Sequence, residues 1–310
     1  MGAMLQNAGT VFEQVLVLFL IACIGYICGK REILTEDTAN GLASICLYAV
    51  APCLMISSFQ RSFALGMLWN FLLTFAFAMA AMAISIVLTG LTIRDRDARR
   101  EKVLRSGVIF PNCGMVSLAL EQALYGADGV FYGAAYIAAF NLVFWTYGVF
   151  LLGSRQDISW RKILLNPGIL GTAAGLIFFF ASIRLPGPLK AVSDQIAGLN
   201  TPLAMLVIGE RIAFMEKKAL FTDKGAVWAS VQRLLLFPLI SILGLWVLGI
   251  EKEVGMICVI AASAPAAACN TMLAMNLGQD SALSAKMVSL STAASMFTMP
   301  IMIVLAQAVL

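Results

Sequence analysis

Histidine is absent from this chain of 310 residues, and charged residues make up only 12% of it. A soluble domain carries about 25% charged residues, because its surface must face water. Here 61% of the residues are hydrophobic, and the mean hydropathy is +0.90. Since so few charges cannot cover a water-facing surface, most of the chain is expected to lie in a lipid bilayer. The composition therefore predicts an all-α polytopic membrane protein.

The same absences argue against several activities. Serine and zinc intramembrane proteases use histidine, and the Gly-x-Gly-Asp motif of the aspartyl type is also missing. The seven cysteines lie in apolar stretches without the paired spacing of a zinc site. No cluster of Lys and Arg interleaves with aromatic residues away from a membrane flank, which argues against nucleic-acid binding. We therefore predict no enzymatic activity, no cofactor, no metal site and no nucleic-acid partner.

Apolar runs long enough to cross a bilayer recur along the chain. One helical crossing needs about 20 predominantly apolar residues. Charged residues, Gly, Pro and Asn divide the chain into ten predicted spans, at 11–29, 39–59, 67–93, 103–124, 129–152, 163–183, 191–215, 226–249, 254–277 and 281–309. The two shortest separations, 125–128 and 278–280, are predicted to be tight turns.

Basic residues are distributed unevenly between the two sets of loops. The loops after even-numbered spans hold only Arg61, Arg184, Lys190 and Lys252. Those after spans one, three, five and seven hold Lys30, Arg31, Arg94, Arg96, Arg99, Arg100, Lys102, Arg105, Arg155, Arg161, Lys162, Arg211, Lys217, Lys218 and Lys224. Because cytoplasmic loops are enriched in Lys and Arg, we predict that these odd-numbered loops are cytoplasmic. Both termini then lie on the non-cytoplasmic side, which requires an even number of spans.

The two halves of the chain repeat a pattern of prolines. Pro52 and Pro111 fall in spans two and four, and Pro202 and Pro265 fall at a similar spacing in spans seven and nine. Since each half has five spans, the second half would enter the bilayer from the opposite side, as in an inverted repeat. We predict repeats at 1–153 (helices 1–5) and 160–310 (helices 6–10), joined by 154–160.

Proline is expected to interrupt spans four and nine. Pro111, followed by Asn112, removes a backbone donor and displaces the preceding turn. The helix that restarts presents free N–H groups and a positive dipole end, which suit an anion. In span nine, Pro265 is followed by Asn270 among small residues, which allow another backbone to approach closely. Each feature alone is equally compatible with an ordinary kink or helix packing. The pair at matching positions predicts a binding site.

Three motifs carry a resemblance to a known family. They are Pro111-Asn-Cys-Gly-Met-Val-Ser-Leu-Ala-Leu, Asn200-Thr-Pro-Leu-Ala-Met-Leu-Val-Ile-Gly and Ser263-Ala-Pro-Ala-Ala-Ala-Cys-Asn-Thr-Met-Leu-Ala, with Asp280 and Ser291-Thr292 following. In order and spacing they resemble the auxin efflux carrier family, which includes plant PIN proteins and bacterial malonate and malate carriers. The likeness covers nearly the whole chain, including Gly25-Tyr26 and Asn166-Pro167-Gly168, and departs at Ala119, where the family often has proline. The long cytoplasmic loop of many plant members is absent, so the chain looks like a bacterial-type member.

The resemblance implies a five-plus-five inverted-repeat fold similar to sodium/proton antiporters and bile-acid symporters, with crossed, proline-broken helices 4 and 9. It also implies a scaffold of helices 1, 2, 6 and 7, and a transport domain of helices 3–5 and 8–10 that moves like an elevator. A bacterial inner membrane would be its location. Substrate would bind where the broken helices cross, near Pro111 and Asn112 and near Pro265 and Asn270. Asn141 in span five is a further candidate to face that point. The substrate-binding residues so predicted are Pro111, Asn112, Cys113, Gly114, Asn141, Pro265, Asn270 and Thr271.

Several functions compete on this fold. Span five carries no carboxylate, which argues against sodium/proton exchange and favours an organic solute whose carboxylate meets dipoles and amides. We predict a secondary transporter of a small organic anion, with the lipid bilayer as its surroundings. Sodium- or proton-coupled symport of bile-acid-like solutes, and a transporter-like substrate-sensing receptor, stay open as alternatives. The glycine pairs 25/29 and 171/175 suit either a homodimer face or helix packing within one subunit.

Charged residues inside the spans are costly and often functional. Glu13, Glu121 and Glu210 fall near span ends, where we expect them to reach interfacial water. Arg233 is expected to snorkel or to pair with Glu210, and Arg105 to attract an anion from the cytoplasm. Proton coupling would require Glu121 or Glu210 to change its exposure during the cycle.

Overall fold

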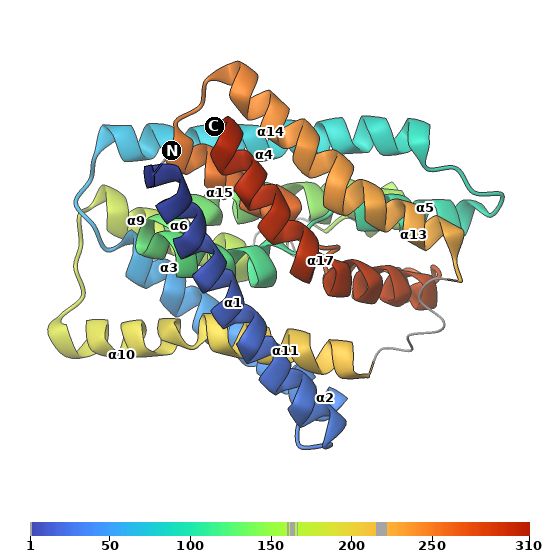
Figure 1. The fold of residues 1–310 in the computed structure, drawn as a ribbon, viewed down its shortest axis with the longest axis horizontal. Coiled ribbons are helices and arrows are strands. Elements are labelled where there is room, and N and C mark those ends of the chain that lie inside the picture. Colours follow the sequence, from blue (N-terminus) through green and yellow to red (C-terminus); the bar gives the residue numbers. More distant parts are fainter. Residues whose placement is uncertain (1, 160, 162–164, 166, 215–221) are drawn as a thin grey trace. The chain divides into compact units, whose positions relative to one another are not determined.

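The computed structural model describes residues 2–159, 161, 165, 167–214 and 222–310, and this part of the chain is helical without a strand (Figure 1). An isolated antiparallel bridge joins Pro111 and Ala266. The all-helical prediction is therefore confirmed. Residues named above that lie outside the described residues are Trp160, Lys162, Ile163, Asn166, Met215, Lys217 and Lys218.

Six helical stretches of the described chain are long and apolar enough to cross a membrane: Glu36–Phe59, Leu65–Thr92, Cys113–Leu152, Gly187–Ala213, Lys224–Leu248 and Ser281–Val309. Leu16–Lys30 and Gly168–Phe180 are shorter apolar helices. These stretches support an integral membrane protein. The ten-helix, five-plus-five arrangement stays a prediction.

The chain forms two compact units, of which the first comprises Met1–Ala76, Gly114–Asn141 and Leu164–Phe214. It contains α1 (Gly2–Lys30), α2 (Glu36–Ile45), η1 (Cys46–Val50), α3 (Ala51–Phe59), α9 (Pro167–Phe180), α10 (Gly187–Gly198) and α11 (Asn200–Ala213). It also includes the start of α4 (Leu65–Thr92) and most of α6 (Leu118–Val143). In this unit α1 packs along α11, and α3 packs against α9 and α10.

Glycine lets α1 and α11 approach closely. A Cβ atom placed at Gly25 would overlap the backbone of Leu206, and one at Gly209 would overlap the backbone of Ala22. Gly171 and Gly175 of α9 likewise leave room for side chains of α3. The glycine pairs thus pack helices within the subunit, which is the second of the two interpretations suggested by the sequence.

Gly126 forms a sharp turn within α6. Its φ of 58° and ψ of −132° are not helical, and glycine adopts such angles without a steric penalty. The segment before Gly126 and the segment after it are therefore two arms of a hairpin. The tight turn predicted at 125–128 is confirmed.

The second unit comprises Phe77–Cys113, Leu142–Ile163 and Met215–Leu310. Besides the rest of α4, its elements are α5 (Ala98–Ile109), η3 (Phe144–Gly148), α7 (Val149–Leu152), η4 (Arg155–Asp157), α13 (Lys224–Val231), η5 (Gln232–Leu236), α14 (Phe237–Leu248), α15 (Lys252–Ser263), α16 (Cys269–Asn276) and α17 (Ser281–Val309). Helix α17 contacts α5, α13, α14, α15 and α16, so it is central to this unit. Gly278, with φ 66°, turns the chain between α16 and α17, as predicted for 278–280.

Arg100 joins three acidic residues of the second unit. Its guanidinium lies 2.7 Å from Asp223, 3.3 Å from Asp95 and 3.9 Å from Asp280. Asp223 is also the N-cap of α13, since its Oδ1 accepts from the Ala226 N–H at 3.0 Å. Burial acts to raise the pKa of Asp223, but the bonds from Arg100 and Ala226 outweigh burial, so this pKa lies below its usual value.

We expect Asp223→Asn to lower the stability of the folded protein near neutral pH by about 1 kcal/mol, because it removes the charge but keeps a side chain that can cap. Because the pKa of Asp223 is lower in the folded state, the ionised carboxylate stabilises the fold at pH values above the unfolded-state pKa of about 4. This stabilisation is lost as the pH falls through the folded-state pKa. Thermal unfolding in detergent should show the variant's deficit shrinking on acidification.

The matched control is Asp97→Asn, which changes an exposed N-cap residue of α5. Asp97 forms no ion pair with the described residues. A deficit for Asp223→Asn that stays constant with pH, or equals that of the control, would contradict the assignment.

Candidate functional site at two helix breaks in the second unit

Two helices of the second unit stop next to a proline. Helix α5 ends at Ile109, and Phe110 is extended, with φ −104° and ψ 103°. Helix α15 ends at Ser263, and Ala264 is extended, with φ −61° and ψ 148°. Since Pro111 and Pro265 lack an N–H and displace the preceding turn, each helix ends before its proline. The chain becomes helical again at Cys113 in η2 (Cys113–Ser117) and at Cys269 in α16. Both predicted interruptions are present.

The two interrupted segments pair with each other through their backbones. Around the bridge between Pro111 and Ala266, the Asn112 N–H donates to the Pro265 carbonyl at 2.7 Å. The Ala267 N–H donates to the Phe110 carbonyl at 3.0 Å. We call residues 110–112 and 264–267 the paired breaks. Backbone groups that the breaks free from helical bonding thus satisfy one another, as an apolar environment requires.

Arg233 binds the ends of both interrupted helices. Its side chain comes from η5 and is 2% exposed. The guanidinium donates to the carbonyls of Val108 (2.9 Å), Ala264 (3.1 Å) and Ala262. Each helix C-terminus carries about −0.5 elementary charge, so one guanidinium offsets the two ends of α5 and α15. The prediction that Arg233 snorkels to the interface is wrong, because these carbonyls hold it inside the protein.

Asn112 has an available side chain. It is half-buried and forms no side-chain hydrogen bond with any residue that the structure describes. Cys113, which follows, is buried, whereas Gly114 is exposed. After the second break, Ala268 is also exposed. The chain is therefore accessible at the point where each helix restarts.

Asn270 differs from Asn112 because its amide is used within the protein. The side chain is 1% exposed, and its Oδ1 accepts from the Ser106 hydroxyl at 2.8 Å. Its Nδ2 lies 3.5 Å from the Phe110 carbonyl, at the long limit for a hydrogen bond. The half-buried Thr271 hydroxyl lies 3.1 Å from the Ser284 hydroxyl. Asn270 thus links α16 to the last turn of α5 and to the first break.

The remaining predicted residues lie elsewhere. Asn141 belongs to the first unit and is buried, and its contact with substrate stays a prediction. Glu13 is exposed, as expected. Glu121 and Glu210 are each only 1% exposed, so the prediction that they reach interfacial water is wrong. Arg211 Nε lies 3.8 Å from Glu210, whereas Glu121 forms no ion pair within the described chain.

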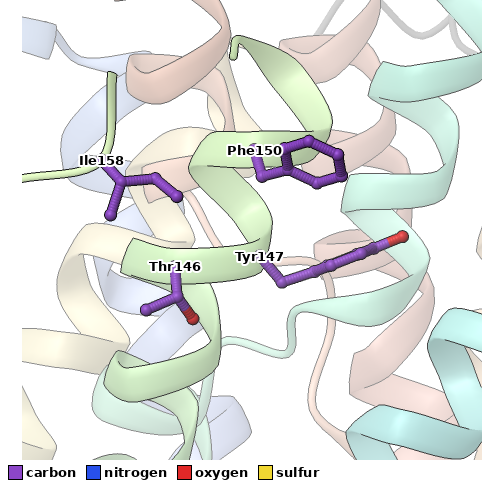
Figure 2. A pocket seen from close by; sticks show the side chains of 4 residues that line it. All are labelled: Thr146, Tyr147, Phe150 and Ile158. Carbon is purple, nitrogen blue, oxygen red and sulfur yellow. The ribbon is translucent and has the colours of Figure 1, made fainter. Parts of the chain in front are cut away.

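An open pocket of about 380 Å³ lies within the second unit, lined by Thr146 and Tyr147 of η3, Phe150 of α7, and Ile158 (Figure 2). Figure 2 shows Tyr147 and Phe150 extending from the same side of their helix. Arg105, which was expected to attract an anion, donates to the Tyr147 hydroxyl at 3.4 Å. This bond places the Arg105 guanidinium beside the pocket-lining tyrosine.

Comparison with known proteins places the chain in a family. A family model described as membrane transport protein matches residues 10–159 and 155–303. The chain belongs to this family. It is the auxin efflux carrier-like family that the three motifs resemble, so that prediction is confirmed. A protein of Methanothermobacter thermautotrophicus named "Uncharacterized transporter" is 23% identical over 294 residues, covering 93% of this chain and 96% of the relative. Family and relative both indicate a membrane transporter.

Proposed function

We propose that the protein is a secondary transporter of a small organic anion, and that the substrate carboxylate binds at the paired breaks. One observation carries the proposal. Arg233 covers the negative ends of α5 and α15, while the restarting helices and the unpartnered Asn112 amide stay accessible. The local charge balance therefore favours an anion on the accessible side.

The chemistry proposed for the site uses dipoles and amides. A helix N-terminus carries about +0.5 elementary charge and N–H groups that point along the axis. A carboxylate near Asn112 would accept from its Nδ2–H, and such charge-assisted bonds are stronger than neutral ones. Asn270, with its amide bonded to Ser106, would hold the first break in place. These roles give Asn112 a contact with substrate and Asn270 a positioning role.

The mechanism that we propose is an elevator movement in a bacterial inner membrane, with both termini on the non-cytoplasmic side. Helices 3–5 and 8–10 of the five-plus-five repeat would move against helices 1, 2, 6 and 7. The grouping of α1–α3 with α9–α11, and of α13–α17 in the other unit, supports this division. Helices 3–5 are shared between the units, since α4 divides between Ala76 and Phe77 and residues 114–141 group with the first unit.

Exchange assays in proteoliposomes test the function. Purified protein is loaded with one unlabelled carboxylate, and the entry of labelled mono- and dicarboxylates is measured. The primary amide and the amine with the same carbon skeleton serve as matched competitors. We expect carboxylates to compete and amides and amines to fail, because only a carboxylate meets the dipoles with a full negative charge.

Two results would contradict the proposal. Preferential exchange of the amine would show a cation site, and tight carboxylate binding without any exchange would favour a receptor. Repeating the exchange with and without sodium separates sodium-coupled symport from the sodium-independent transport expected here.

A further inference from the structure

Glu121 is a buried acid that the proposed substrate site does not use. It lies in the first arm of the α6 hairpin and is 1% exposed. One carboxyl oxygen, Oε1, accepts from the Ser117 hydroxyl at 3.0 Å. The other, Oε2, is buried and has no hydrogen-bond partner among the described residues. Half of this carboxyl group is therefore unsatisfied inside the protein.

The second arm of the hairpin closes over the carboxyl group. The chain reverses at Gly126, and a Cβ atom placed at Gly133 would overlap Oε2 of Glu121. A Cβ atom at Gly129 would overlap the Glu121 backbone as well. Gly133 thus leaves room for the carboxyl group in its present position. Because Glu121 is only 1% exposed, it reaches water only if the hairpin or its surroundings move.

The charges on the neighbouring elements are occupied by other partners. Thr201 of α11 donates to Ala119, and Gln122 donates to the Ala197 carbonyl of α10, so these helices pack on the same arm. The other charged groups of the hairpin, α10 and α11 form the pairs Asp128 with Arg61, Lys190 with Asp194, and Glu210 with Arg211. The titratable tyrosines of the hairpin are Tyr125, Tyr132 and Tyr136.

A carboxylate buried without a cation costs several kcal/mol, whereas a neutral carboxylic acid costs far less to bury. In this conformation Glu121 is therefore expected to hold a proton. The ionised carboxylate is stable only where water solvates Glu121. A side chain with these two states can carry one proton across the membrane if its exposure changes during the transport cycle.

We propose that Glu121 is the proton-binding residue that couples transport of the organic anion to a proton gradient. On one side of the membrane, water delivers a proton and an O–H bond forms at the carboxylate. The acid is buried against Gly133 while the anion crosses, and on the other side the O–H bond breaks and the proton returns to water. One proton then accompanies each anion. This inference rests on the proposed function.

The test compares two assays in the same proteoliposomes. Carboxylate exchange at equal pH on both sides reports transport, and accumulation driven by a pH gradient reports coupling, with the membrane potential held at zero. For one proton per monovalent anion, one pH unit corresponds to about tenfold accumulation in the wild type. Glu121→Gln keeps the shape of the neutral acid but cannot release a proton, so we expect exchange to persist and accumulation to be lost. Glu13→Gln, which changes an exposed glutamate, is the matched control and should accumulate substrate like the wild type.

Each outcome separates coupling from function. Accumulation by Glu121→Gln at the wild-type level, or a wild type that exchanges carboxylate but does not accumulate it under a pH gradient, would overturn the coupling proposal. The transport function would still stand. Absence of carboxylate exchange in the wild type would instead overturn the proposed function. If the variant does not fold, a pH-sensitive dye inside liposomes with the wild-type protein can report proton entry instead. Proton entry on addition of substrate is expected, and its absence would refute the coupling.

Discussion

Arg233→Met will remove most of the folded, transport-competent protein. The substitution keeps much of the side-chain volume but withdraws the donors from the carbonyls of Val108, Ala262 and Ala264. Leaving a buried carbonyl without a partner costs about 1–3 kcal/mol. The negative ends of α5 and α15 would also lose their shared cation. A total of about 3 kcal/mol or more is a large fraction of the stability of a typical domain.

Arg233→Lys is expected to be intermediate. The lysine ammonium group keeps the charge. Its compact set of donors cannot replace a planar guanidinium group that bonds the ends of two helices at once. The control is Arg99→Met, because Arg99 is exposed and its side chain forms no bond with the described residues. Thermal unfolding in detergent and carboxylate exchange measure both effects. Equal stability of Arg233→Met and Arg99→Met would contradict the claim that Arg233 stabilises the ends of α5 and α15.

Asn270→Ala will lower stability and transport together. The change leaves the buried Ser106 hydroxyl without its acceptor and frees the Phe110 carbonyl from its weaker contact. One unsatisfied buried group costs about 1–3 kcal/mol, and the first break would lose its positioning contact. Melting temperature and exchange rate should therefore fall in parallel. Asn276→Ala, at an exposed position of the same helix, should change neither.

A double-mutant cycle with Ser106→Ala separates positioning from a general packing loss. If Ser106 and Asn270 act through their hydrogen bond, the double variant should be less destabilised than the sum of the single variants. Strict additivity would show that Asn270 acts by another route.

Local chemistry made the helix breaks and turns predictable. Pro111 and Pro265 each remove a backbone donor, and their matching places in the two halves made the interruptions predictable. Proline alone does not decide a break, since Pro300 lies inside α17 without ending it. Gly126 and Gly278 likewise have the positive φ that tight turns require. These features depend on a residue and its immediate neighbours, and single-sequence reasoning reaches them.

The partners of buried polar groups were not predictable in the same way. Arg233 meets carbonyls of two other helices, and nothing in the sequence near Arg233 specifies them. Glu121 was expected near water because it falls close to a span end. The hairpin at Gly126 brings Gly133 onto its carboxyl group and buries it. Asn270 was singled out correctly as part of the break, but its bond to Ser106 depends on how α5 and α16 pack.

The central claim is that the Asn112 side chain at the paired breaks binds the substrate carboxylate. The most direct measurement is the dissociation constant of a transported carboxylate for the wild type, Asn112→Ala and the exposed-site control Asn276→Ala. Loss of one charge-assisted hydrogen bond is expected to raise the constant about tenfold or more for Asn112→Ala. The melting temperature should stay unchanged, because Asn112 has no side-chain partner among the described residues. An unchanged dissociation constant would contradict the proposed site.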